Sequence, residues 1–135
     1  MEKSITIEIL YPSQQSEMVS VFYMEGDKVA KIFIGESLEE NIQLDKDVFI
    51  DIYNKMLDLD YAAILKENAD KIVIDGIMVN VILSMGDSSL TVNLTREDQD
   101  LYSTSTGSQS EKFYELTKNL LDVLEEKGVK FESLK

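Results

Sequence analysis

Carboxylates are the side chains in this chain best suited to chemistry. Asp58 and Asp60 flank Leu59 at the end of a predicted helix, and Asp75 lies in a turn that can bring it close to them. Carboxylate oxygens are the ligands that Ca²⁺ and Mg²⁺ prefer. A metal-dependent enzyme or subunit that uses Asp58, Asp60 and Asp75 is therefore one hypothesis. Their spacing does not match an EF-hand loop, and acidic neighbours arise by chance among 26 Asp and Glu residues.

A polar stretch of about a dozen residues, 96–107, precedes the last predicted helix, and loops of this length often carry function. Asp98 and Asp100 lie within it and can meet a basic partner or a cation. Tyrosine is common at the energetic centres of protein interfaces, so Tyr102 and Tyr114 can anchor a partner. We predict that these four residues form a partner-binding site.

The chain lacks the residue types that most enzymes depend on. It has no histidine and no cysteine, which excludes Ser–His and Cys–His nucleophile pairs and the usual zinc sites. Any chemistry would have to use carboxylates, lysine, tyrosine or a hard cation. We therefore expect a protein that is not an enzyme, with no catalytic residue, no metal site and no cofactor.

Charge limits the partners. The net charge is −13, from 26 acidic and 13 basic residues, so phosphate backbones and anionic lipid repel the chain. We expect no nucleic-acid and no membrane partner, whereas a basic protein would be attracted. The sequence contains no run of about 18 apolar residues, and charge interrupts its beginning where a signal peptide would be apolar. Together with the lack of cysteine, this predicts a cytoplasmic protein.

The 135 residues are expected to form one domain, residues 1–135. Apolar and polar residues alternate along three predicted strands, 4–11, 18–24 and 28–34. The clearest hairpin joins strands 77–85 and 88–95 through Gly86-Asp87, and its first arm is expected to be the inner one because it is apolar on both faces. A short strand is also predicted at 71–74, while 35–44 reads as irregular.

Two amphipathic helices complete the expected fold. Asp45 is a suitable N-cap for the first, whose apolar stripe is formed by Val48, Phe49, Ile52, Met56 and Leu59. A further helical turn is expected at 61–65, with Ile64 and Leu65 packed. Ser108 and Glu111 form a capping box for the last helix. The sequence therefore predicts an α+β domain, in which an antiparallel sheet of five or six strands carries two helices on one face.

The succession of Asp75-Gly76, Gly86 and the segment Phe113-Tyr114-Glu115-Leu116 resembles small bacterial proteins of the toxin-immunity type. This resemblance covers roughly the C-terminal half and implies a protein that neutralises a toxin by binding it. The chain departs from the pattern because it has no Trp after Asp75-Gly76, and the resemblance transfers no site residues.

Three functions are therefore expected in turn. The first is a non-enzymatic, acidic protein-binding domain, such as an immunity protein that blocks a basic toxin. The second is the metal-dependent enzyme or subunit described above. The third is a structural subunit that self-associates through a free sheet edge, which would make the protein a homodimer.

Overall fold

The structure is a computed structural model that describes residues 2–13, 15–68, 77–96 and 109–129. The strands are β1 (Glu2–Leu10), β2 (Ser16–Met24), β3 (Val29–Ile34), β4 (Ser37–Asp45), β5 (Ile77–Met85) and β6 (Ser88–Arg96). The helices are α1 (Lys46–Leu57), α2 (Tyr61–Asn68) and α3 (Gln109–Glu126).

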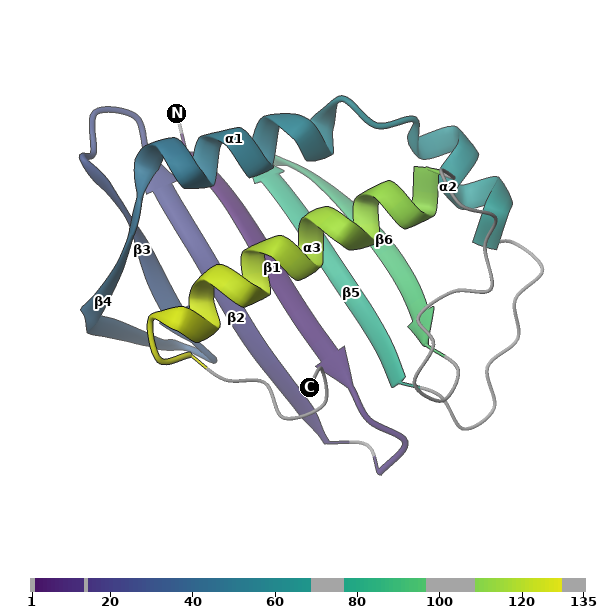
Figure 1. Ribbon diagram of the computed structural model, residues 1–135, viewed down its shortest axis with the longest axis horizontal. Coiled ribbons are helices and arrows are strands. Elements are labelled where there is room, and N and C mark those ends of the chain that lie inside the picture. Colours follow the sequence, from purple (N-terminus) through teal and green to yellow (C-terminus); the bar gives the residue numbers. More distant parts are fainter. Residues whose placement is uncertain (1, 14, 69–76, 97–108, 130–135) are drawn as a thin grey trace.

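The strands form one antiparallel sheet in the order β4-β3-β2-β1-β5-β6. Figure 1 shows α1 and α3 lying across the same face of this sheet, with α2 near the beginning of α3. The prediction of an α+β fold, with five or six antiparallel strands and two helices on one face, is confirmed. None of the described helices is both long enough and apolar enough to cross a membrane.

The core lies between the sheet and the two helices, and strand alternation builds it. In β1, Ile5, Ile7 and Ile9 are fully buried, whereas the residues between them are only partly covered. Ile7 has Val19 of β2 on one side and Val81 of β5 on the other, so the apolar face continues across the strands. Burial of each such side chain contributes about 1.5–3 kcal/mol, so this layer is the main source of stability.

The hairpin predicted around Gly86-Asp87 is confirmed. All residues from Ile77 to Met85 pair in regular register with those from Arg96 to Ser88. Gly86 has a φ of 59°, a left-handed conformation that glycine adopts without steric cost, and its N–H donates to the Glu2 carbonyl at 2.9 Å. The prediction that the first arm is the inner one is also confirmed, because β5 lies between β1 and β6.

Residues 37–45, which the sequence analysis left irregular, form strand β4 instead. The cause of the error is a break in register: β4 pairs in two short stretches, and residues 40–42 have no partner on β3. Leu44 therefore lies opposite Ala30 on the helix side, whereas Leu38 lies opposite Phe33 on the other side. A bulge of this kind removes the period of two by which a strand is recognised.

Three helix predictions need correction. Asp45 occupies the N-cap position of α1, but its side chain makes no capping hydrogen bond. Val48 is 37% exposed because the buried stripe is narrower than predicted and is centred on Phe49 and Ile52. On α2, Ile64 is buried but Leu65 is 67% exposed, so only the first of them packs. The predicted strand at 71–74 and the Ser108 cap lie outside the described residues.

Candidate functional site

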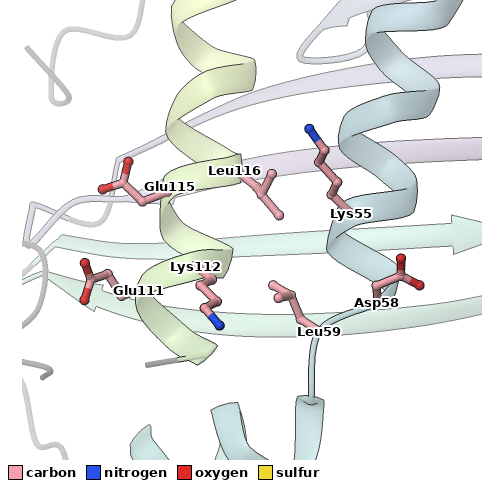
Figure 2. Close-up of a pocket in the computed structure, with 7 residues that line it drawn as sticks. All are labelled: Lys55, Asp58, Leu59, Glu111, Lys112, Glu115 and Leu116. Carbon is pink, nitrogen blue, oxygen red and sulfur yellow. The ribbon is translucent and has the colours of Figure 1, made fainter. Parts of the chain in front are cut away.

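An open groove lies between the end of α1 and the first half of α3, and we call it the interhelical groove. It has a volume of about 390 Å³ and is lined by Lys55, Asp58, Leu59, Glu111, Lys112, Glu115 and Leu116. Figure 2 shows Leu59 and Leu116 pointing into the space between the two helices. Both are half-buried, so they form an apolar floor that water and a ligand can reach. The volume falls within the range of about 300–1,000 Å³ that is usual for ligand pockets.

Charged groups surround this apolar floor. Lys55 extends from α1 toward α3, and its ammonium lies 3.0 Å from a carboxylate oxygen of Asp51, one turn earlier. Both side chains of that pair are about 60% exposed, so the pair contributes well under about 1 kcal/mol. Lys112 lies on the groove side of α3, whereas Glu111 and Glu115 project from the other side of that helix (Figure 2).

Asp58 stands at an unfavourable position for a carboxylate. It is the C-cap of α1, and its backbone N–H donates to the Asn54 carbonyl at 3.1 Å. The C-terminal end of a helix carries partial negative charge, so a carboxylate there loses about 0.3–1 kcal/mol where a cation would gain it. A positive group bound beside Asp58 would be stabilised by both the carboxylate and the helix end.

The segment after α1 is held in place by backbone and side-chain hydrogen bonds. The Asp60 carboxylate accepts from the Ala63 N–H at 3.1 Å, which caps the beginning of α2. The Asp60 N–H donates to the side-chain oxygen of Gln109 at 2.9 Å, and Gln109 is the first residue of α3. These bonds fix the end of α1 relative to the beginning of α3, and therefore fix one end of the interhelical groove.

Tyr61 and Phe113 pack together at the same end. Their ring centroids are 6.1 Å apart in an edge-to-face arrangement, and the Tyr61 hydroxyl donates to the Met56 carbonyl of α1. Burial raises the pKa of Tyr61 to about 12, and the nearby Tyr53 raises it further in the same direction. Tyr61 is therefore neutral at physiological pH and acts as a structural link among α1, α2 and α3.

An aromatic cluster anchors α1 to the sheet beneath it. Tyr53 is 1% exposed, and its hydroxyl donates to the Ser84 carbonyl of β5 at 2.8 Å. Its ring lies 5.7 Å from that of Phe49, and the Lys3 ammonium lies 5.6 Å from the ring centroid of Tyr53. Burial raises the pKa of Tyr53, so this hydroxyl also stays protonated and keeps donating.

The structure places only part of the predicted partner-binding site. Tyr114 lies on α3 and is half-buried, but it is not among the residues that line the interhelical groove. Asp98, Asp100 and Tyr102 lie outside the described residues. The four residues therefore remain a prediction, and they are distinct from the groove that the helices form.

The metal hypothesis stands in a similar position. Within the described ranges, no group of three or more acidic residues is arranged to hold a metal ion. Asp60 already caps α2 with one carboxylate oxygen, and Asp75 lies outside those ranges. Asp58 and Asp60 therefore have structural surroundings of their own, which the sequence did not reveal.

Sequence reasoning missed the interhelical groove although it placed two of its residues correctly. Leu59 and Leu116 were assigned to the apolar stripes of their helices. The signal that could have revealed the groove is their position: each stripe extends close to a helix end where lysine and carboxylate residues flank it. Apolar residues there cannot all reach the sheet, and some of them stay partly exposed between the helices.

Fold and site together define a small α+β domain with an open, partly apolar groove between two helices. No known protein family matches the chain, and no curated protein and no solved structure is significantly similar to it.

Proposed function

We propose that this protein is a non-enzymatic binding domain that holds a basic partner protein at the interhelical groove. The observation that carries the proposal is the combination of an accessible apolar floor, Leu59 and Leu116, with a surplus of carboxylates around it. Asp51, Asp58, Glu111 and Glu115 face two ammonium groups, those of Lys55 and Lys112. The strongly negative chain would draw a basic partner toward this surface.

The groove suggests how the partner would bind. Two helices with an apolar floor between them favour an amphipathic helix or a protruding side chain of the partner as the occupant. An apolar anchor would cover Leu59 and Leu116, while flanking lysine or arginine side chains would meet Asp58 and Glu115. Most of the affinity would come from the anchor, and the surrounding charges would mainly raise the association rate and the specificity.

An immunity protein that neutralises a basic toxin is the biological role that fits this arrangement best. Such a protein needs strong, specific binding and no chemistry of its own, in keeping with an acidic chain without histidine or cysteine. We propose that the complex forms in the cytoplasm, where a toxin-producing cell would need protection.

A capture experiment with paired variants tests the proposal. The bait is the full chain as wild type, as Leu116→Asp in the groove, and as Leu65→Asp on the exposed face of α2. The extract comes from the cells that make the protein, and products of the adjacent genes are tested one by one. We expect a basic protein to be retained by wild type and Leu65→Asp, and to bind Leu116→Asp at least about 30-fold more weakly, as for an interface hot spot.

Salt provides the second criterion. Raising the salt from about 50 mM to about 500 mM screens exposed charges and should weaken the complex about tenfold or more. Asp58→Asn and Glu115→Gln should reduce this salt dependence while the apolar floor stays intact. A dissociation constant that is the same in both salts, or a partner that binds Leu116→Asp as well as wild type, would contradict the proposal.

A further inference from the structure

The two edges of the sheet differ in how well they are protected against pairing with another strand. Edge strand β4 has a break in register after three pairs and carries Glu39 and Glu40 next to the break. Bulges and charges are the usual devices that stop an edge from accepting a further strand. Strand β4 also continues directly into α1, so both its geometry and its charge oppose pairing.

Edge strand β6 has none of these devices. It pairs with β5 at every position from Ser88 to Arg96 without a bulge. Its residues from Ser88 to Thr95 include no charged side chain and no proline. In a chain of net charge −13, this is a long uncharged strand at the edge of a regular sheet. Such an edge is a ready template for a further strand.

The phase of the hydrogen bonds shows which groups β6 offers. Met85 and Ser88 flank a two-residue turn, so they form a hydrogen-bonded pair, and hydrogen-bonded pairs then recur at every second residue. Leu90 and Val92 therefore direct their N–H and C=O groups toward β5. Ser89, Thr91 and Asn93 direct theirs toward the free edge, where a further strand could accept and donate.

We propose that β6 pairs with β6 of a second copy of this chain, antiparallel and across a two-fold axis. When the two strands overlap fully, the middle residue, Val92, lies opposite its own copy. Thr91 then lies opposite Asn93 of the second copy. Both of these residues have outward backbone groups, so they form a hydrogen-bonded pair and the Val92 pair is of the other type. Full overlap thus satisfies the hydrogen-bond phase without any slip in register.

Charge favours a second copy as the occupant of this edge. Two chains of −13 repel each other, and they can approach most closely where neither presents a carboxylate. Strand β6 is such a place, and a two-fold axis through Val92 sets no charged residue of the strand centre against a like charge. Because the remaining repulsion is long-range, salt should strengthen this dimer. A complex with a basic partner should respond to salt in the opposite way, so the two proposals can fail separately.

Sedimentation velocity over a concentration series tests the pairing, first at low and then at high salt. Thr91→Lys places a charge at the centre of the edge, and Asn41→Lys makes the same change of charge on β4. We expect a monomer–dimer equilibrium for wild type and Asn41→Lys, and a dissociation constant at least about tenfold higher for Thr91→Lys. Wild type that stays monomeric up to about 0.5 mM at high salt, or equal weakening by both substitutions, would overturn the proposal.

A cross-link identifies the register. The chain has no cysteine, so Val92→Cys introduces a single thiol at the two-fold axis. Opposite residues of a non-hydrogen-bonded pair have Cα atoms about 4.5 Å apart, a distance that a disulfide spans. Under mild oxidation, Val92→Cys should give a covalent dimer, whereas Val81→Cys on the interior strand β5 should not. Equal cross-linking of the two variants, or none at Val92→Cys, would exclude this register.

Discussion

The hydroxyl of Tyr53 provides a direct test of how α1 is fixed to the sheet. It donates to the Ser84 carbonyl at 2.8 Å from a side chain that is 1% exposed. Tyr53→Phe removes this hydrogen bond but keeps the ring, with its neighbours Phe49 and Lys3. The net value of the bond is about 0.5–1.5 kcal/mol, and the carbonyl left without its donor adds to the loss. We therefore expect Tyr53→Phe to lower the free energy of unfolding by about 1–2 kcal/mol.

Urea unfolding followed by far-UV circular dichroism at neutral pH measures this change. The midpoint should fall while the slope of the unfolding free energy against urea stays the same, because the exposed area hardly changes. Tyr53→Ala is the comparison variant: it also removes the packed ring and should cost about 3–5 kcal/mol. If Tyr53→Phe unfolded within about 0.3 kcal/mol of wild type, the bond would not hold α1, and the reasoning would be refuted.

Three further predictions concern the surroundings of the interhelical groove and the β5–β6 turn. Burial raises the pKa of Tyr61 to about 12 from an ordinary value of 10.0, so its stabilising contribution is complete below pH 10 and is lost as the pH rises toward 12. In urea melts across this window, Tyr61→Phe should therefore lose less stability than wild type. Asp60→Ala removes the cap of α2 and should cost about 1 kcal/mol, and thermal melts with and without millimolar Mg²⁺ should show the same loss. Gly86→Ala places a Cβ on a backbone with a φ of 59° and should cost about 1–2 kcal/mol, whereas Asp87→Ala should cost less; equal losses would mean that the turn conformation is not the cause.

Local patterns carried much of the fold. The hairpin at Gly86-Asp87 was predictable because a turn residue and two alternating strands indicated the same structure, and the stripe of α3 was predictable because Phe113 and Leu120 recur at helical spacing. Strand β4 was not predictable in this way, since its bulge places Leu38 and Leu44 on opposite faces. The alternation that reveals a strand is lost when three residues have no partner.

Tertiary contacts explain what the sequence could not show about the site. Tyr53 was not on the predicted stripe of α1, because its burial depends on a carbonyl of β5 that is distant in sequence. Asp60 was considered as a cation ligand, and only the structure shows that its carboxylate caps α2. The interhelical groove depends on how α1 and α3 lie relative to each other, which no local pattern in the sequence records.

The Asp75–Leu94 segment was expected to be the centre of the fold, and the structure places the hairpin differently. Strand β5 is an interior strand, but β6 is an edge, and β1 and β2 occupy the middle of the sheet. The edge position follows from strand order, which is set by long-range pairing of β1 with β5 rather than by the hairpin itself. A strong hairpin signal identifies two neighbouring strands but not their place in the sheet.

The most direct test of the central claim is to map the bound partner by NMR. The ¹⁵N-labelled chain would be titrated with the basic protein that wild type captures, and the amide shifts would be assigned to residues. We predict that the largest shifts cluster at the interhelical groove, around Lys55, Leu59, Lys112 and Leu116, and that they are absent in Leu116→Asp at the same concentrations. Shifts that cluster on β6 or on the sheet face opposite the helices, with the groove unchanged, would contradict the claim.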